Sequence, residues 1–450
     1  MVRDVVIVGG GIAGLACGVA LTDAGLRVTL VERDKRLGGR ARSWTDAASG
    51  DDIDLGPHVL HSEYRNMLAL LERLGTRHLV SWQSDKLLQF SNGVVLRHRR
   101  LPPPLSLLPD LALQSGLSPR DLWSNNRPTV DAMRFNEADT PVLDSMSALD
   151  YLRDAGVTQA MIDWFWAFAC LAVLNVPLER CSAAALLRVH SQLIGHRRIH
   201  FGFPAVALGD LFAPQAAKLI GRVLTGSEVI KMEPNAVVLQ DGSRIGADRV
   251  VSTVPPQIEA SPYVSCYLWF DRKLTRERFW AQLGAQTRLN TDFYDLSNIR
   301  RGWEKRPSVI ASNIIYSHRA HAMTNEEIVA ATQREIAAFV PEAAQARVVH
   351  AVVNRIPMVI PCPLPGSESA RPAPCAALAG DWTRTGLPCS MESAACSGFI
   401  AAEEILQTRG IALPVRPADG LAGLVQRLRR RAAPGPGGRT LPTARPSPRP

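Results

Sequence analysis

The stretch VVIVGGGIAGLACGVALTDAGLRVTLVE, residues 5–32, decides how the chain starts to fold. Residues 5–8 form a short apolar run that predicts a buried parallel strand, and residues 12–24 predict a helix that Gly25 ends. A second apolar run over residues 28–31 predicts the next strand. This order of elements is that of a βαβ unit, so the chain is expected to open with part of a parallel sheet.

The glycine turn of this unit has the spacing G-x-G-x-x-G and predicts a dinucleotide site. Gly9 allows the tight turn, Gly11 lets the backbone approach a pyrophosphate, and Gly14 lets the helix pack on the strand. The helix N-terminus faces the phosphates, and Glu32 accepts hydrogen bonds from ribose hydroxyls. A glycine turn without a ligand is the alternative, and the surrounding strand, helix and acid argue against it. The first set of expected contacts is Gly9, Gly11, Ile12, Ala13, Gly14, Glu32 and Arg33.

Composition and charge exclude several classes of function. The 450 residues are 46% hydrophobic and 21% charged, which is typical of a globular chain with two or three domains. The net charge of +9 depends on residues 421–450, which hold seven arginines and no acid. Removing those seven charges leaves about +2 for the rest, so no nucleic-acid partner is expected. The eight cysteines form no C-x-x-C pair, so we expect no metal site, and reduced thiols in a cytoplasmic protein.

Three further motifs resemble those of one family of flavoproteins. They are Gly38-Gly39-Arg40, IDLGPH over residues 53–58, and LAGDWTRTGLPCSMES over residues 378–393. Together they resemble the squalene/phytoene desaturase branch of the FAD-dependent amine oxidase superfamily, across about residues 4–408. The resemblance implies an enzyme, an FAD-dependent oxidoreductase, with FAD as its cofactor. It places Gly38, Gly39 and Arg40 against the phosphates and the flavin end, Pro57 and His58 beside the isoalloxazine, and the Val229 backbone at the adenine.

The resemblance also gives the loop over residues 380–390 a place beside the flavin. Residues 376–379 predict a short buried strand before the loop, and residues 390–406 predict an amphipathic helix after it, ended by Gly410. Asp381 is then expected to accept hydrogen bonds from the ribityl chain, although a plain turn residue would also fit here. The positive end of the helix dipole would stabilise the reduced flavin. The contacts expected from this loop are Gly380, Asp381, Ser390, Met391 and Glu392.

The whole pattern predicts an α/β fold, with a Rossmann-type FAD-binding domain built from discontinuous segments and a mixed α+β substrate domain. The FAD-binding domain is expected over residues 1–60, 205–257 and 370–410, and the substrate domain over residues 61–204 and 258–369. Strands near residues 223–254, with a hairpin signal at Asp241-Gly242, return the chain to the first domain. Strands are also expected over residues 264–270, 308–315 and 348–353, and a helix over residues 326–339.

Residues 60–210 have little strand character, with helical pieces at residues 68–74 and 149–152. Residues 101–110, LPPPLSLLPD, are apolar but broken by prolines, so they cannot form one helix. This segment fits a lid or a membrane-contacting face, and it fits a packed loop equally well.

Motifs in the middle of the chain resemble those of bacterial hydroxysqualene dehydroxylases within this family. The most specific are LAVLNVP, residues 171–177, and CSAAAL, residues 181–186. They imply hydride transfer at flavin N5 to or from a long apolar isoprenoid, in squalene or hopanoid biosynthesis. A phytoene-type carotenoid desaturase, a flavin amine oxidase and a non-catalytic FAD-binding scaffold are the alternatives. The segment TGLPCSMESA, residues 385–394, departs from the more usual TGLPATIEGA and leaves the substrate open.

Candidate catalytic side chains follow from the chemistry of a departing hydroxide, which requires a proton donor or an electrostatic partner. The candidates are His58, His61 and Asp295, and each also fits a structural role. The aromatic side chains of the helical region would line a tunnel for the apolar substrate, or belong to an ordinary helix core. They are Trp164, Phe165, Trp166 and Phe168.

The tail over residues 411–450 is basic and expected to be mostly disordered, since proline and glycine dominate residues 434–450. Within it, LAGLVQRLRRR, residues 421–431, predicts a short amphipathic helix that suits an anionic membrane surface, although a solvated tail fits equally. No signal peptide or transmembrane helix is predicted. The chain is therefore expected in the cytoplasm, with a peripheral position on the inner membrane as an option. Nothing in the sequence indicates an oligomeric state.

Overall fold

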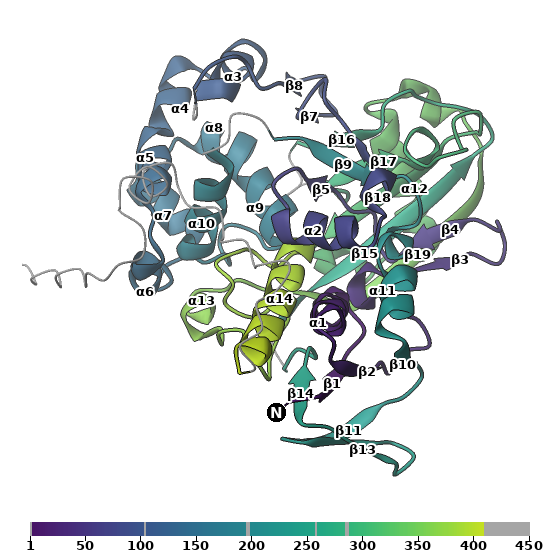
Figure 1. Cartoon of the computed structure of the whole chain (residues 1–450). Helices are drawn as coiled ribbons and strands as arrows, with labels where there is room; N and C mark the ends of the chain where they lie inside the picture. Colours follow the sequence, from purple (N-terminus) through teal and green to yellow (C-terminus); the bar gives the residue numbers. More distant parts are fainter. Residues whose placement is uncertain (1, 103–104, 195–198, 257–258, 284–287, 409–450) are drawn as a thin grey trace, which may run out of the picture.

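The structure is a computed structural model of the chain, and it describes residues 2–102, 105–194, 199–256, 259–283 and 288–408. Two main sheets and a group of helices make up this part of the chain (Figure 1). A parallel sheet holds the first strands, an antiparallel sheet lies to one side of it, and the helices between residues 108 and 194 lie to the other side.

The parallel sheet has the strand order β10-β2-β1-β14 and contains the predicted βαβ unit. Its strands are β1 (Asp4–Val8), β2 (Arg27–Val31), β10 (Arg222–Leu224) and β14 (Arg249–Ser252). Helix α1 (Ile12–Asp23) joins β1 to β2, and its ends lie within one residue of the prediction. The sheet therefore combines strands from the start of the chain with strands from its middle, while the full domain division stays a prediction.

Helix α14 (Met391–Gln407) packs along α1, so the first and the last of the described helices lie side by side (Figure 1). Gly398 allows this approach, because a side-chain carbon added there would lie 2.3 Å from the Ala13 carbonyl oxygen. Helices α2 (Arg65–Arg73) and α11 (Ala213–Ile220) contribute to the same hydrophobic core. Gly410, the predicted end of α14, and the tail lie outside the described residues.

The strand predicted over residues 376–379 is wrong. This segment forms a tight turn between Cys375 and Leu378, and it meets β14 through one isolated bridge from Leu378 to Ser252. Ala377 is exposed rather than buried. Pro372 and Pro374 precede the turn, and because proline lacks the N–H that a ladder needs, the segment cannot extend into a strand.

A small meander lies against the outer residues of the parallel sheet. It consists of β11 (Val229–Glu233), β12 (Ala236–Leu239) and β13 (Arg244–Gly246), and it packs on Val8 and Val31. The predicted hairpin at Asp241-Gly242 is confirmed. Gly242 has a φ of +83°, which glycine adopts without strain, and its N–H donates to the Leu239 carbonyl oxygen.

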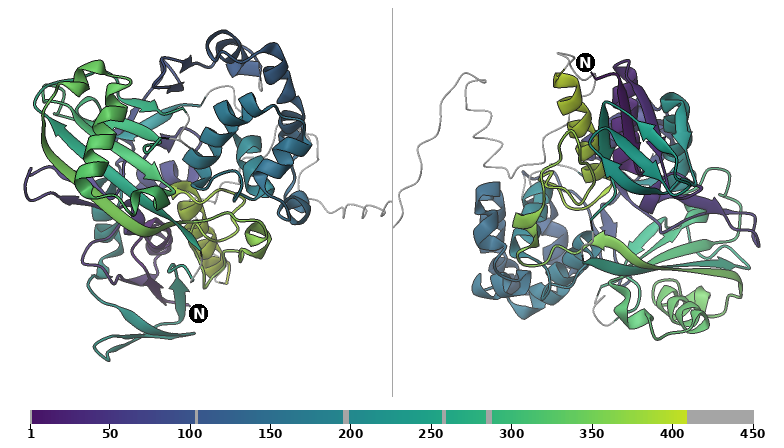
Figure 2. Two further views of the ribbon diagram at one scale, coloured as in Figure 1. Left: turned by 180° about the vertical axis from the view of Figure 1, so that it is seen from behind. Right: turned by 90° about the horizontal axis from the view of Figure 1, so that it is seen from below.

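The antiparallel sheet has the order β16-β17-β18-β15-β19. Its strands are β15 (Ala260–Phe270), β16 (Phe279–Ala281), β17 (Asp292–Asp295), β18 (Val309–Ile315) and β19 (Val348–Pro361). Helix α12 (Asn325–Ala337) covers one face, as Figure 2 shows, close to the predicted range. Strand β19 runs eight residues beyond the predicted end. Its last residues, Ile360 and Pro361, line the same cavity as residues of α9 and α10.

The helices between residues 108 and 194 are mostly short. They are α3 (Leu108–Gln114), α4 (Pro119–Ser124), α5 (Asn126–Arg134), α6 (Thr140–Leu143), α7 (Ala148–Asp154), α8 (Gln159–Met161), α9 (Ala167–Leu174), α10 (Ala183–Ile194) and, later in the chain, α13 (Ser367–Ala370). A π-helical turn over Ile162–Trp166 precedes α9. The prediction of little strand character missed short strands here. These are β5 (Leu60–His61), β6 (Val80–Trp82), β7 (Leu88–Gln89), β8 (Val95–Leu96) and β9 (Phe201–Pro204), besides β3 (Ser43–Thr45) and β4 (Asp52–Asp54) nearer the start.

The proline-broken segment does not form one helix, as predicted. Leu105–Leu107 make a short 3-10 turn, and α3 begins at Leu108 with Pro109 in its first turn. Among the helices that the structure describes, none combines the length and the apolar character that a membrane crossing needs.

Candidate cofactor site and adjoining pocket

The glycine turn after β1 is held by the acid that the sequence places at the end of β2. The buried Glu32 carboxylate accepts hydrogen bonds from the Gly10 N–H at 2.6 Å and from the Asp34 N–H at 2.8 Å. A carboxylate has about four acceptor positions, so two backbone donors leave capacity for ribose hydroxyls. Gly14 permits the close packing of the turn, since a side-chain carbon there would lie 2.0 Å from the Gly9 carbonyl oxygen.

The open side of the turn lies at the N-terminus of α1. A side-chain carbon added at Gly11 would meet no atom within 4 Å, so the backbone faces free space there. The first amides of a helix, here those of Ile12, Ala13 and Gly14, have no intrahelical acceptor and attract an anion. These features fit a pyrophosphate, as predicted, and the assignment of these residues stays a prediction.

The second glycine pair lies directly against the first turn. The Gly38 N–H donates to the Gly10 carbonyl oxygen at 2.8 Å, and a side-chain carbon on Gly39 would lie 3.2 Å from the Gly11 Cα. Both glycines have positive φ, +109° and +56°. The two motifs therefore form one surface, which the resemblance expects for the phosphates and the flavin end. Arg33 is exposed at its edge.

The segment before β11 brings Val229 close to this surface. The Ser227 N–H donates to the Glu32 carbonyl oxygen at 2.9 Å, and the Glu32 N–H donates to the Leu224 carbonyl oxygen at 2.8 Å. Val229 itself packs against the core that contains Val31. The backbone of Val229 is therefore near Glu32, the acid predicted to bind ribose, and its contact with the adenine stays a prediction.

An ion pair between Arg40 and Asp381 joins the two ends of the chain at this site. Asp381 is buried, and the residue before it, Gly380, donates its N–H to Ser397 Oγ at 2.8 Å. Gly380 has a φ of +149°, and a side-chain carbon there would collide with the indole of Trp382. The structure gives the Asp381 carboxylate a guanidinium partner, so its expected contact with the ribityl chain stays a prediction.

The turn over residues 54–58 brings Pro57 and His58 to the site that contains Arg40. His58 Nδ1 donates to the Gly56 carbonyl oxygen at 2.7 Å, and the Pro57 carbonyl oxygen accepts from Asn313 Nδ2 at 3.3 Å. Burial lowers the pKa of His58 below its ordinary value, and the nearby Arg40 acts in the same direction. A neutral His58 with its proton on Nδ1 leaves Nε2 as an acceptor, so it is not a proton donor near neutral pH.

The other two catalytic candidates have structural contacts. His61 stacks on Tyr64 with 5.7 Å between ring centroids, and its Nδ1 accepts from the Glu63 N–H at 3.1 Å. Asp295 is fully buried and caps a short turn, accepting from the Ser297 N–H at 3.0 Å and Ser308 Oγ at 2.7 Å. Burial raises its pKa. Strand β17 places Asp295 about 10 Å beyond the end that faces Pro57.

The N-terminus of α14 faces the site with Ser390, whose side chain caps the helix by accepting from the Ser393 N–H at 3.2 Å. Met391 packs in the core below. The Glu392 carboxylate turns toward α2, where it accepts from the Asn66 and Met67 N–H groups at 2.9 and 2.8 Å. The side chain of Glu392 therefore links α14 to α2. The predicted contact with the flavin would be made by the backbone of this turn.

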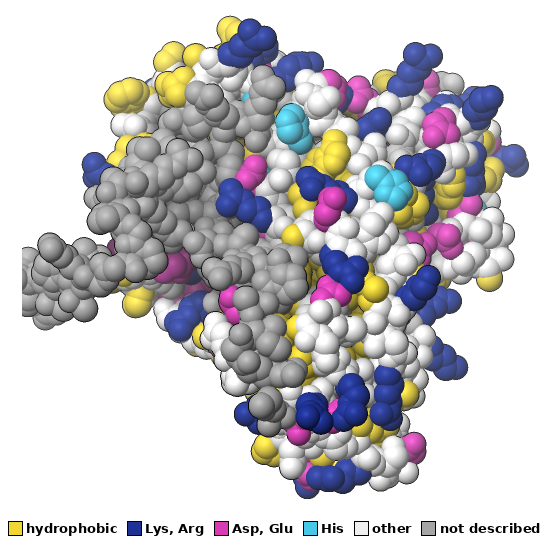
Figure 3. Space-filling model, in the orientation of Figure 1, with side chains coloured by type: hydrophobic (Ala, Val, Ile, Leu, Met, Phe, Trp, Pro, Cys, Tyr) yellow, Lys and Arg dark blue, Asp and Glu magenta, His cyan; other side chains and the backbone are white. Residues whose placement is uncertain are grey.

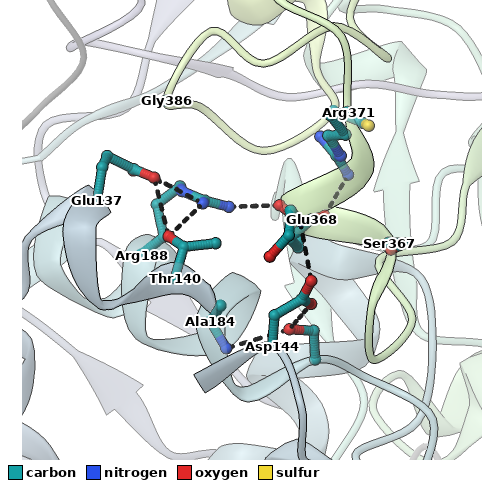
Figure 4. A network of polar contacts seen from close by, with 12 residues as sticks. Glu137, Thr140, Asp144, Ala184, Arg188, Ser367, Glu368, Arg371 and Gly386 are labelled. Atoms are coloured by element: carbon teal, nitrogen blue, oxygen red, sulfur yellow. Dashed lines mark hydrogen bonds and ion pairs between the residues drawn. The ribbon is translucent and has the colours of Figure 1, made fainter. Parts of the chain in front are cut away.

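A pocket that the sequence did not predict adjoins the loop before α14. Its walls are mostly apolar, and three charged side chains of low exposure line it, Arg188, Glu368 and Arg371, which Figure 4 shows as sticks. Cys389 lines it as well. Burial raises the pKa of the Cys389 thiol to about 12, so this cysteine is neutral. The one available sequence signal was Arg188, an arginine inside the apolar stretch AAALLRVHSQLI.

The predicted tunnel aromatics divide between two cores. Trp164 and Phe168 pack against Phe90, with ring centroids 5.5 and 5.2 Å away. Phe165 and Trp166 point to the other side, toward His190 on α10. A tunnel lining by all four is therefore not supported, because the π-helical turn separates their directions. In the residues that the structure describes, no group of His, Cys, Asp or Glu side chains is arranged to hold a metal ion.

Comparisons with known proteins agree with this geometry. A family model described as flavin containing amine oxidoreductase matches residues 12–260 and 256–406. The 15-cis-phytoene desaturase of Solanum lycopersicum is 25% identical, over 90% of this chain and 78% of its own length. Carotenoid phi-ring synthase of Streptomyces griseus is 27% identical, over 94% of this chain and 92% of its own.

Solved structures show the same fold. A putrescine oxidase bound to putrescine has a TM-score of 0.68 at 17% identity, covering 90% of this chain and 99% of that chain. Cyclohexylamine oxidase from Brevibacterium oxydans IH-35A has a TM-score of 0.67 at 17% identity, covering 91% of this chain and 100% of that chain.

Proposed function

Because the chain belongs to the flavin containing amine oxidoreductase family, we propose that this FAD-dependent oxidoreductase acts on a long apolar isoprenoid, in a reaction of the hydroxysqualene dehydroxylase type. When bound, FAD supplies N5 as the atom that takes or gives a hydride. The observation that carries the proposal is the match, over 90% and 94% of this chain, to curated relatives named as a phytoene desaturase and a carotenoid phi-ring synthase. Curated relatives that act on phytoene, over most of their length, support the substrate class.

The residues proposed to hold FAD form a continuous surface from the glycine turn to α14. Amides of the first helical turn would bind the pyrophosphate, Glu32 would bind ribose, and Arg40 with Asp381 would lie at the flavin end. The N-terminal amides of α14 would stabilise negative charge on the reduced flavin. FAD binding thus depends on segments from both ends of the chain.

The two alternative reactions require different properties of the substrate site. A phytoene-type desaturase needs apolar walls alone, and the relatives named above favour it. A flavin amine oxidase must admit a cationic or neutral amine. The sequence relatives named above carry the names of carotenoid enzymes and not of amine oxidases. We therefore place the amine oxidase reaction last.

We also propose that the protein works in the cytoplasm and contacts a membrane through one face, since its substrate is a lipid. Large apolar side chains are exposed on α3 and α4, among them Leu113 at 83% and Trp123 at 76%. Figure 3 shows hydrophobic side chains gathered at the upper left, over these helices. The exposed side chains of Arg100 and of Arg120, which lies on α4, suit anionic headgroups.

The test is turnover with defined lipids in detergent micelles. Photoreduced enzyme is mixed with hydroxysqualene, and oxidised enzyme with phytoene or squalene, while flavin absorbance and lipid products are followed. We expect reoxidation of the flavin and formation of squalene in the first mixture. Product from phytoene alone would instead establish the desaturase alternative, and absence of any product from an FAD-loaded enzyme would reject an isoprenoid substrate.

A further inference from the structure

The face of the antiparallel sheet that is turned away from α12 carries a row of polar side chains. Asp292 on β17 lies opposite Asn313 on β18, and Asn313 lies opposite Ser265 on β15. Ser265 Oγ donates to the Leu55 carbonyl oxygen at 2.7 Å, and Asn313 Nδ2 donates to the Pro57 carbonyl oxygen at 3.3 Å. The row therefore lies against the turn that is expected beside the isoalloxazine.

This polar row is not completely enclosed where it meets the turn. Asp292, Asn313 and Tyr263 keep 6%, 6% and 8% of their surface accessible, whereas the neighbouring Ser265 keeps none. His58, at the end of the turn, is only partly buried, and yet burial lowers its pKa. A side chain that is both accessible and desolvated lines a recess rather than the outer surface. The polar row and the turn therefore border a recess, which is the space open to a ligand.

The Asp292 carboxyl is held firmly through one of its two oxygens. Its Oδ1 accepts from Asn313 Nδ2 at 2.7 Å, and the Tyr263 hydroxyl fixes this amide by donating to Asn313 Oδ1. Within the described ranges, the second oxygen, Oδ2, accepts no hydrogen bond of ordinary length, and it is not fully enclosed. Oδ2 is therefore the oxygen that can meet a ligand.

The surroundings of Asp292 favour its protonated form. Burial raises its pKa to about 7, although the Asn313 amide and the nearby Tyr294 hydroxyl act in the opposite direction. Burial also raises the pKa values of Tyr263 and Tyr294, and Asp54 in the turn acts on Tyr263 in the same direction, so both phenols are neutral. Among the residues that the structure describes, no arginine or lysine pairs with Asp292. A carboxyl of this kind can give a proton and regain it near neutral pH.

We propose that Asp292 is the proton donor of the reaction and protonates the oxygen that leaves an isoprenoid alcohol bound in this recess. This inference rests on the proposed isoprenoid function and specifies the acid that a dehydroxylation needs. His58 directs its proton to Gly56, and Asp295 lies about 10 Å farther along β17, so neither can serve.

The proposed step balances with the reduced cofactor as the reductant. As the C–O bond breaks, its electron pair goes to the oxygen, which takes the Asp292 proton and leaves as water. The carbon is reduced by the hydride that reduced FAD supplies, and FAD is oxidised. Asp292 is left as a carboxylate and regains a proton from solvent.

The first test compares two leaving groups on the photoreduced, FAD-loaded enzyme. Asp292→Asn keeps a hydrogen-bonding side chain of the same shape but has no acidic proton, so flavin reoxidation by hydroxysqualene should slow at least about hundredfold. The Kd of this alcohol for the oxidised enzyme should stay within about threefold, because the amide still forms a hydrogen bond. The acetate ester of hydroxysqualene loses an anion that needs no proton, so its rates in the variant and the wild type should agree within about tenfold.

The second test observes the proton without turnover. Infrared difference spectra of the oxidised enzyme, with and without hydroxysqualene, should show the C=O band of a protonated carboxyl that shifts on binding. In the free enzyme this band should vanish as the pH rises through about 7, and Asp292→Asn should lack it. Asp241→Asn is the matched control, because it makes the same change in an exposed hairpin turn, and it should keep the band and the wild-type rate.

A wild-type rate with the alcohol in Asp292→Asn would overturn the role of Asp292 and leave the isoprenoid function standing. A wild-type spectrum without a band that responds to the alcohol would do the same, whether or not the variant folds. Equal slowing with the alcohol and the ester would also overturn it, since the substitution would then disturb the site rather than the proton transfer. Failure of both lipids to reoxidise the wild-type flavin would reject the proposed function itself.

Discussion

His58 shows how a backbone contact decides what a side chain can do. Its Nδ1 proton is committed to the Gly56 carbonyl oxygen, and burial holds its pKa below the ordinary 6.5. The unfolded chain therefore binds more protons than the folded one as the pH falls below 6.5, and stability is lost there. At neutral pH His58 accepts a proton or a hydrogen bond, and the proton for a departing hydroxide has to come from another group.

Replacing His58 should make the free energy of unfolding depend less on pH. Between pH 7.5 and 5.5, we expect the wild type to lose about 1 kcal/mol more unfolding free energy than His58→Gln. Urea unfolding of both proteins at the two pH values measures the difference. Identical losses in the two proteins would show that His58 is protonated equally in the folded and unfolded chain.

At the same scale, the sequence identified residues whose role depends on the backbone and missed those whose role depends on distant partners. Gly9, Gly11 and Gly14 were predictable because their spacing alone determines the turn. Arg188 pairs with Glu137 and Glu368, which are 51 and 180 residues away. No local pattern encodes such a pairing, so the charged edge of the pocket could not be predicted.

Among the elements, α14 illustrates how one helix can cap another. Helix α2 has no side-chain cap of its own, and Glu392 on α14 instead accepts the N–H groups of Asn66 and Met67 and the side-chain amide of Asn66. The carboxylate also lies at the positive end of the α2 dipole. The contact fixes the first turn of α14 relative to α2, and with it the amides that would face the flavin.

Removal of this contact should destabilise the protein markedly. Glu392→Ala leaves two backbone donors and an amide without their acceptor, so we expect a loss of about 2–3 kcal/mol in the free energy of unfolding. Glu403→Ala, on the same helix, is the control and should cost under about 0.5 kcal/mol. Chemical denaturation of all three proteins measures this, and equal losses in the two variants would contradict the capping role.

Element prediction succeeded where a long periodic run has clear ends. Helices α1 and α14 lie within about one residue of the predicted bounds at their starts, because a glycine turn and a serine cap mark them. The strands β5 and β9 were missed, since two to four residues carry no periodicity. The strand expected over residues 376–379 failed because nearby prolines limit pairing to a single bridge.

For the whole molecule, the positions of the two ends explain why the cofactor site could be inferred but the substrate could not. Helices α1 and α14 meet at Gly398, and Arg40 reaches Asp381 across 341 residues of sequence. Both ends carry recognisable motifs, so the site follows from them. The pocket is assembled from α9, α10, β19 and the loop before α14, and its shape depends on how these elements pack.

The exposed apolar face on α3 and α4 leads to a prediction about the molecule as a whole. Leu113 and Trp123 are largely exposed there, which is costly in water and favourable at a lipid interface. Since each large apolar side chain contributes roughly 1–2 kcal/mol on burial, Leu113→Glu with Trp123→Glu should weaken binding to anionic vesicles at least about tenfold. Co-sedimentation of the full chain with phosphatidylglycerol-containing vesicles measures this.

The matched control removes two exposed apolar side chains elsewhere. Ile230 and Met232 on β11 are 62% and 50% exposed, and β11 lies at the opposite end of the molecule from α3 (Figure 1). Ile230→Glu with Met232→Glu should therefore leave vesicle binding nearly unchanged, although it adds the same two negative charges. Equal weakening by both double variants would mean that net charge rather than the α3–α4 face determines binding. Added salt would then abolish the binding of the wild type, because screening acts on charge and not on apolar burial.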